Sequence, residues 1–325
     1  MGMGHVQQST TLAKALRYAA DVFFVTKSDE HVVATIKEAG FDVRALMNDG
    51  QVFAALQSTL PDVVLFDKID VGVDLARRIR AELPSRLVIF TNLTPANAYA
   101  HMVVLQRAAE LSTDPDRRFR NEAFTDPTSG TDYFYGPRYW VLRPEFHAYR
   151  ALGKTPRRPP RRILLAFGGS DPTNLTSAVL DQLLGSETHY TIDAILGLHF
   201  SYQEAVERTL QNHNERRHAV TLHRNVSNVA DLMYAADLAI TAAGMSMFEA
   251  LCVGTPVIVI PQDSLQRDTY KGVMRLLEVG DLEELEGIIE KNDCTRPDDA
   301  PIAAMMIGEG IYQLINSIIT PKEIG

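Results

Sequence analysis

Short runs of apolar residues recur along this chain and alternate with stretches whose apolar residues have helical spacing. The runs consist mainly of Val, Ile, Leu and Phe, which is typical of strands that are buried on both faces of a parallel sheet. Helices between such strands cover the two faces of the sheet. The alternation therefore predicts doubly wound α/β domains, with strands at residues 22–25, 63–66, 87–90, 102–105, 163–167, 192–196, 220–222, 238–241 and 257–260.

Composition limits the class of protein. The 325 residues indicate two domains at about 150 residues each, and 46% of them are hydrophobic, as in packed globular proteins. The formal charge of −9 gives no overall basic field for nucleic acid. Cys252 and Cys294 are the two cysteines, which fits a reducing compartment. Because we find neither a signal-peptide pattern nor an apolar run of about 18 residues, we expect a cytoplasmic protein without an integral membrane segment.

The segment Lys154–Arg162, KTPRRPPRR, separates two α/β halves. Its prolines lack backbone donors and disfavour helix, which predicts an extended linker. We expect an N-terminal domain over 1–153 and a C-terminal domain over 163–325. The arginines of the linker leave open a patch for nucleic acid or anionic lipid, although a solvated linker is favoured. Helical spacing over 302–319 predicts a terminal helix, which can pack back on the N-terminal domain.

The chain begins with a glycine turn that leads directly into a helix. Gly2 and Gly4 permit close backbone approach, and N–H groups at a helix start attract phosphate or a developing negative charge. His5 follows them, and histidine is suited to act as a general base near neutral pH. An ordinary helix start with a surface histidine is the alternative. A doubly wound domain has a strand ahead of such a turn, so we expect that the first strand is missing from this sequence.

A second glycine loop follows the strand at 163–167. Gly168 and Gly169 leave the sheet, and Ser170 or Asp171 can cap the helix that comes next. Ligands of open α/β sheets bind at this carboxyl edge of the strands, so Gly169 and Ser170 are candidate substrate-binding residues. A plain strand-to-helix turn is equally compatible with these residues. The loop does not have the Walker spacing of phosphate-binding ATPases.

A third loop, TAAGMSMFEA, follows the strand at 238–241. Its small residues let a ligand lie against the backbone, and the helix that begins near Met245 offers N–H groups and a positive dipole end to a diphosphate. Glu249 falls in the early turns of that helix, where its carboxylate can bind ribose hydroxyls or merely complement the dipole. The strand at 257–260 ends at the same edge. The candidate nucleotide-site residues are Ala243, Gly244, Met245, Ser246, Glu249, Gln262 and Gln266.

Other chemistries have less support in the sequence. The histidines lack HxH or HExxH spacing, which argues against a zinc site. A G-x-S-x-G elbow for a nucleophilic serine is also lacking. Asp67 and Asp70 close a buried strand, where they could hold a metal, orient a base or cap a helix. We predict neither a metal nor a cofactor.

Three motifs together resemble a known family: GMGHV, LLAFGGSDPTNLT and TAAGMSMFEALCVGTPVIVIP. They are similar to the UDP-sugar hydrolase of pseudaminic acid synthesis and its spore coat polysaccharide relatives, and more distantly to the lipid II N-acetylglucosaminyltransferase. The segment at 135–146, YGPRYWVLRPEF, resembles that family's lead-in to the second domain. The resemblance covers nearly the whole chain. It implies the GT-B architecture, in which two doubly wound domains face a cleft.

The resemblance also implies roles for individual residues. His5 would be the catalytic base at the tip of the Gly2/Gly4 turn, and Glu249 would bind the ribose. Gly169 and Ser170 would line the cleft. No metal is implied, because a helix end can neutralise the diphosphate. The residues that would meet the diphosphate are Ala243, Gly244, Met245 and Ser246, with Gln262 and Gln266 near the sugar or phosphate.

The predicted function is that of a UDP-amino-sugar hydrolase of surface polysaccharide or nonulosonic acid biosynthesis, with His5 activating water. A glycosyltransferase that uses a UDP-sugar donor is the alternative, and it would allow peripheral membrane contact. A non-catalytic sugar-nucleotide-binding protein is the third hypothesis, because Gln7–Gln8 replaces the usual Arg-Cys pair and Phe90–Leu93 lacks the acidic residues of relatives. The expected partner is a UDP-sugar and not nucleic acid. The sugar, the acceptor and the oligomeric state remain open.

Overall fold

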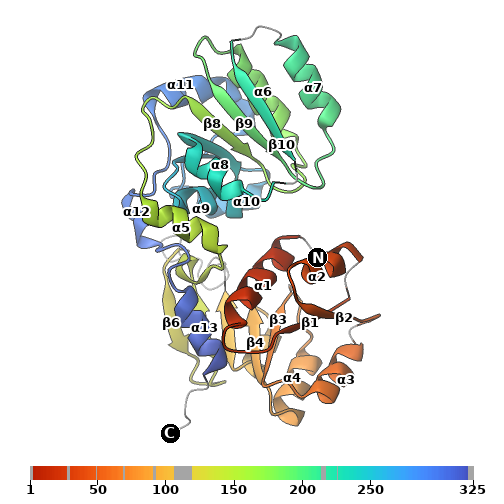
Figure 1. Ribbon diagram of the computed structural model, residues 1–325. Coiled ribbons are helices and arrows are strands. Elements are labelled where there is room, and N and C mark those ends of the chain that lie inside the picture. The colour runs from red at the N-terminus through yellow and green to blue at the C-terminus, as the bar shows by residue number, and fades with distance from the viewer. Residues whose placement is uncertain are drawn as a thin grey trace. The chain divides into compact units, whose positions relative to one another are not determined.

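The structure is a computed structural model, and it divides into two compact units (Figure 1). The first unit comprises residues 1–143 and 304–325, and the second comprises residues 144–303. The sequence-based domain bounds, 1–153 and 163–325, stay a prediction. Within the described residues, no helix is long and apolar enough to cross a membrane. The structure describes residues 3–27, 30–48, 50–68, 70–90, 93–105, 119–213, 217–224 and 226–320.

Mostly parallel strands build the first unit. Five of them form one sheet in the order β3-β4-β5-β7-β6, and β1 pairs with β2 in a separate two-stranded sheet. Only β6 and β7 pair in antiparallel orientation among these strands. β4 and β5 are almost wholly buried, as expected for the middle of a covered sheet. The strands are β1 (Phe23–Thr26), β2 (Asp42–Ala45), β3 (Val63–Asp67), β4 (Arg86–Phe90), β5 (Met102–Leu105), β6 (Glu122–Thr125) and β7 (Asp132–Tyr135).

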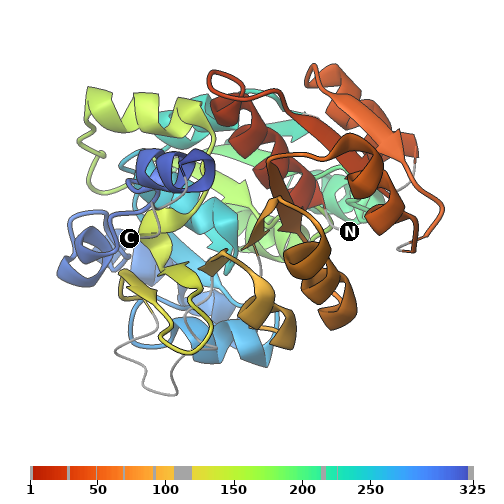
Figure 2. The same cartoon turned by 90° about the horizontal axis from the view of Figure 1, so that it is seen from below.

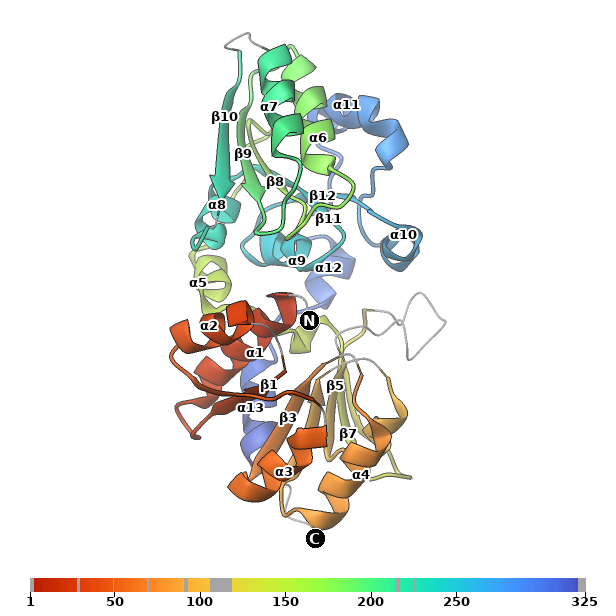
Figure 3. The same cartoon turned by 90° about the vertical axis from the view of Figure 1, so that its right-hand side faces the viewer.

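Helices cover both faces of the five-stranded sheet (Figure 2 and Figure 3). Leu12 of α1 and Leu314 of α13 pack with Val88 of β4 on one face. Phe53 of α3 and Ile79 of α4 pack on the other face. Alternate residues of each strand thus enter the two cores, which is the pattern that the apolar runs predict. The helices of this unit are α1 (Met3–Leu16), α2 (Glu30–Glu38), α3 (Gly50–Thr59), α4 (Val73–Glu82) and α13 (Ile311–Ile319), with short 3₁₀ helices at Pro95–Tyr99 and Pro137–Tyr139.

β1 and β3 each have one edge that no described strand pairs. Most residues of these two strands are only half-buried, and Phe23 at the start of β1 is 41% exposed. α1 packs against both sheets, since Leu12 joins the core of the larger sheet and Ala13 packs with Val22 and Phe24 beside β1. The predicted strand ahead of α1 would lie before the described residues, and it stays a prediction.

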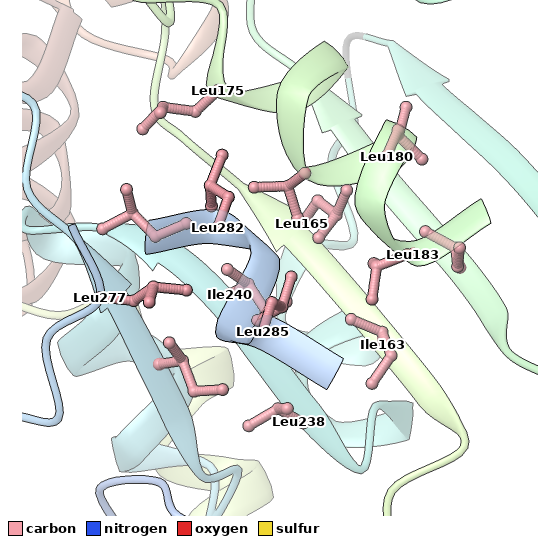
Figure 4. Close-up of a cluster of buried hydrophobic side chains, with 14 of the residues drawn as sticks. Ile163, Leu165, Leu175, Leu180, Leu183, Leu238, Ile240, Leu277, Leu282 and Leu285 are labelled. Carbon is pink, nitrogen blue, oxygen red and sulfur yellow. The ribbon is translucent and has the colours of Figure 1, made fainter. Parts of the chain in front are cut away.

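The second unit contains one parallel sheet in the order β10-β9-β8-β11-β12. α6, α7 and α11 lie over one face, whereas α5, α8 and α9 lie toward the other (Figure 3). Figure 4 shows Ile163, Leu165 and Ile240 of the sheet among Leu183 and Leu285 of the covering helices. The elements are α5 (Pro144–Leu152), β8 (Arg162–Ala166), α6 (Leu175–Gly185), β9 (Thr191–Leu196), α7 (Gln203–Asn212), β10 (Ala219–Arg224), α8 (Val229–Ala235), β11 (Leu238–Ala242), α9 (Met245–Cys252), β12 (Val257–Ile260), α10 (Ser264–Tyr270), a 3₁₀ helix (Val279–Glu284), α11 (Leu285–Lys291) and α12 (Ala300–Ala304).

The basic segment 154–161 forms neither a helix nor a strand, and it is hydrogen-bonded within the second unit. The carboxylate of Asp237 accepts the backbone N–H groups of Arg157, Arg161 and Arg162 at 3.2, 2.9 and 2.8 Å. Asp237 is half-buried, and its three hydrogen bonds to the backbone restrict the conformation of the linker. The linker therefore forms an ordered lead-in to β8.

The prediction of one helix over 302–319 is wrong. The chain forms α12 and α13 with a turn between them, where Met306 and Gly308 have φ values of 48° and 72°. Positive φ at these residues ends a right-handed helix, and the apolar spacing did not reveal it. The sequence analysis also missed β2, β6 and β7. β2 and β6 are short and largely exposed, whereas β7 is short and wholly buried.

Candidate functional site

The loops that the sequence singled out in the second unit lie at one edge of its sheet. β8, β9, β11 and β12 are parallel and adjacent, so the loops after them lie at the same carboxyl edge. This is the edge at which open α/β sheets bind ligands. The topology thus brings together the residue sets around Gly169, Gly197, Gly244 and Gln262.

The β8–α6 loop exposes Gly169 and Ser170, whereas Asp171 behind them is 2% exposed. The two carboxylate oxygens of Asp171 accept the backbone N–H groups of Leu175 and Thr176, each at 2.8 Å. Of the two capping residues that the sequence left open, Asp171 is the one that caps α6. Its negative charge occupies the end of α6 where an anionic ligand would otherwise bind.

The start of α9 is arranged differently. Gly244 stands at its N-cap position and has no side chain that could cap the helix. Ala243 is buried, Met245 is 40% exposed and Ser246 is half-buried. Because an uncapped helix start presents N–H groups and a positive dipole end, α9 is better suited than α6 to bind a diphosphate. Glu249 is half-buried on the next turn of this helix.

The loop after β12 connects to the other loops through Gln262. The side-chain amide of Gln262 donates to the carbonyl oxygen of Phe167 at 3.5 Å, a long contact that ties this loop to the end of β8. Gln266 is engaged within its own loop, because its side-chain oxygen accepts the Gln262 backbone N–H at 2.9 Å. Asp263 caps α10 by accepting the Gln266 backbone N–H at 2.7 Å. A role for either glutamine in ligand binding stays a prediction.

In the first unit, His5 pairs with Asp67. Asp67 ends β3 and its side chain is 5% exposed, whereas that of His5 is 31% exposed. His5 Nδ1 lies 2.7 Å from one carboxylate oxygen of Asp67. The other oxygen accepts hydrogen bonds from Ser9 Oγ at 2.6 Å and Gln8 Nε2 at 3.1 Å. Asp67 therefore holds side chains of α1, and this geometry favours the hypothesis that it orients a base.

The start of the chain differs from the predicted glycine turn. α1 begins at Met3, so Gly4 and His5 lie in its first turn and not at the tip of a loop. This difference could not be predicted from the residue types, because glycine is compatible with both a turn and the end of a helix. Gly2 lies outside the described residues.

The His5–Asp67 pair can move a proton. With a proton on Nδ1 directed to the carboxylate, the lone pair of the imidazole is on Nε2, which can then accept a proton from water or a hydroxyl. The carboxylate also stabilises the imidazolium that forms. Among the described residues, no group of three or more His, Cys, Asp or Glu side chains is placed to hold a metal ion.

The sequence of the second unit matches a known family. Residues 163–275 match the model of the glycosyltransferase family 28 C-terminal domain, and this segment carries all the loops described above. An uncharacterized protein of Methanocaldococcus jannaschii is 35% identical over 324 residues, which are 98% of this chain and 63% of that protein. The spore coat polysaccharide biosynthesis protein SpsG of Bacillus subtilis is 28% identical over 277 residues, which are 83% of this chain and 76% of SpsG.

A solved structure has the same architecture over almost the whole chain. MurG of Acinetobacter baumannii matches with a TM-score of 0.60 at 14% identity, covering 97% of this chain and 96% of MurG. The chain thus has the GT-B fold of two Rossmann-like domains. The resemblance to the spore coat polysaccharide proteins and to MurG, inferred from the three motifs, is confirmed. The chain spans 63% of the length of the M. jannaschii protein.

Proposed function

We propose that this protein binds a UDP-amino-sugar and hydrolyses the bond between the sugar and the nucleotide. His5, held by the buried Asp67, is the observation that carries the proposal, because a base oriented by a carboxylate can activate water. The family 28 match over 163–275 supports a sugar-nucleotide ligand. The name of SpsG supports a role in making surface polysaccharide.

In the proposed reaction, His5 Nε2 takes a proton from water as the water oxygen bonds to the anomeric carbon of the sugar. The bond from that carbon to the β-phosphate oxygen breaks, and its electron pair leaves with UDP. The uncapped start of α9 at Gly244, Met245 and Ser246 binds the diphosphate and stabilises the charge of the leaving group. Glu249 binds the ribose, and Gly169 with Ser170 lines the substrate site.

The test follows UDP release from a panel of UDP-amino-sugars without any acceptor. We expect release by the wild-type protein and a loss of about 10²- to 10⁴-fold in kcat for His5→Ala, with UDP affinity retained. His31→Ala serves as the matched control, because His31 is an exposed histidine of the same unit. Equal rates in the His5→Ala variant and the wild type would remove His5 from the mechanism.

A glycosyltransferase is the second candidate, and the family 28 match is as compatible with transfer as with hydrolysis. In that reaction His5 deprotonates an acceptor hydroxyl in place of water. UDP release that requires an added acceptor glycan or lipid would support transfer over hydrolysis. Tight UDP binding without turnover under either condition would support a non-catalytic binding protein.

A further inference from the structure

The loop from β9 to α7 packs closely on the glycine turn after β8. A Cβ atom placed on Gly197 would lie 2.5 Å from the carbonyl oxygen of Gly168 and 2.4 Å from that of Gly169. Real Cβ atoms essentially never approach so closely, and both neighbours are backbone atoms that cannot simply rotate away. Only glycine fits at position 197, and two consecutive carbonyl oxygens converge on it.

A hydrogen bond fixes the same arrangement. The backbone N–H of His199 donates to the carbonyl oxygen of Gly169 at 2.9 Å. Gly168 turns the chain with a φ of 87°, which glycine adopts without strain. The β9–α7 loop therefore binds the carbonyl side of the Gly168–Gly169 turn at two points.

The opposite side of this turn carries N–H groups. In a trans peptide, a carbonyl group and the N–H of the following residue point in opposite directions. The peptide bonds after Gly168 and Gly169 are trans, because Arg158–Pro159 is the only cis peptide bond within the described residues. Their N–H groups, on Gly169 and Ser170, therefore point away from Gly197. Two successive N–H groups on one exposed side form a concave site that attracts anions.

We propose that Gly197 is a positioning residue, which turns the N–H groups of Gly169 and Ser170 toward the phosphate of the sugar nucleotide. The inference rests on the proposed function and extends it to a residue that would not touch the ligand. Asp171 makes the two N–H groups more important, because its carboxylate already occupies the start of α6. Anion binding at this loop thus depends on the residues ahead of Asp171.

Titration of UDP and of a UDP-amino-sugar into the purified protein tests the proposal. We expect Gly197→Ala to weaken binding by about 10- to 100-fold, the effect of losing hydrogen bonds to a charged group. Gly287→Ala is the matched control, because a Cβ on Gly287 of α11 would meet no atom within 4 Å. His199→Pro removes the N–H that binds Gly169 and also restricts the backbone at that position, and we expect weaker binding there as well. Thermal unfolding of each variant reports its stability separately.

Amide NMR of the wild-type protein gives a readout that does not depend on the folding of any variant. We expect the Gly169 and Ser170 amide signals to shift as UDP is added. UDP binding by the wild type with these signals unmoved, or with full affinity in a folded Gly197→Ala variant, would overturn the role of Gly197. A wild type that does not bind UDP at all would instead refute the proposed function, and the inference with it.

Discussion

Asp67→Asn is the sharpest perturbation of the proposed mechanism, because it removes one charge and almost no volume. The carboxylate accepts hydrogen bonds from Ser9 and Gln8 on one oxygen and faces His5 Nδ1 at 2.7 Å with the other. An asparagine can keep one oxygen acceptor, but its amide group must then donate toward the remaining partner. Either His5 loses the acceptor that fixes its proton on Nδ1, or residue 67 loses its hydrogen bonds with Ser9 and Gln8.

The expected size of the effect follows from this geometry. A hydrogen bond to a charged group contributes about 1.5–3 kcal/mol, and the His5–Asp67 contact joins two charged groups once His5 takes a proton. At about 1.4 kcal/mol for each factor of ten, kcat should fall by about 10- to 150-fold. UDP affinity should stay unchanged, because Asp67 lies in the first unit and the proposed diphosphate contacts are on α9.

The assay measures UDP release at saturating UDP-amino-sugar and, in parallel, UDP binding by calorimetry. Asp70→Asn is the control, since Asp70 is an exposed aspartate just beyond the end of β3. Thermal unfolding of Asp67→Asn detects any loss of folded protein. A folded Asp67→Asn variant with the wild-type kcat would refute the argument that Asp67 orients the base.

Two further predictions concern binding and acid stability. Glu249→Ala should weaken UDP binding by about 1.5–3 kcal/mol if its carboxylate binds the ribose, and unaltered affinity in calorimetry would leave only the dipole role. His101 should make the protein sensitive to acid. Burial lowers the pKa of His101 from 6.5 to about 4, with a further contribution from the charges of Arg80 and Arg86. In its neutral form His101 accepts the Leu87 backbone N–H on Nδ1 at 2.9 Å. The unfolded chain binds a proton on His101 at higher pH than the native state does, so the free energy of unfolding falls as pH falls from 6.5 to 4. Across that range, the thermal unfolding temperature should depend less on pH in His101→Asn than in the wild type. The same pH dependence in both proteins would contradict the prediction.

Much of the second unit could be predicted because its strands are continuous apolar runs and its loops carry distinctive small residues. Runs such as 257–260 are buried along their whole length, so hydrophobicity alone marks them. β6 could not be predicted in the same way, since it is an edge strand whose residues are mostly exposed. The break between α12 and α13 depends on a positive φ at Met306, which the residue type does not indicate.

Some residues of the candidate site were suggested by the sequence, and others were recognised only in the structure. The sequence singled out His5, the Gly168–Gly169 turn and the α9 start as candidates, because histidine and glycine are chemically distinctive. It left Asp67 open among three roles, and only the structure brought Asp67 to 2.7 Å from His5, 62 residues away. Gly197 was missed, because a lone glycine after a strand gives no sign of which backbone atoms it will contact.

The sequence by itself determined the α/β class, the strand ends that carry the loops, and the resemblance to a GT-B family, since these depend on local patterns of apolar and small residues. The tertiary structure decided which functional groups are engaged with one another. In the folded chain the carboxylate of Asp171 caps α6, whereas Gly244 at the N-cap position of α9 has no side chain to do so. Hydrogen bonds and close packing act over a few ångströms between residues far apart in the chain, so only the folded arrangement can show them.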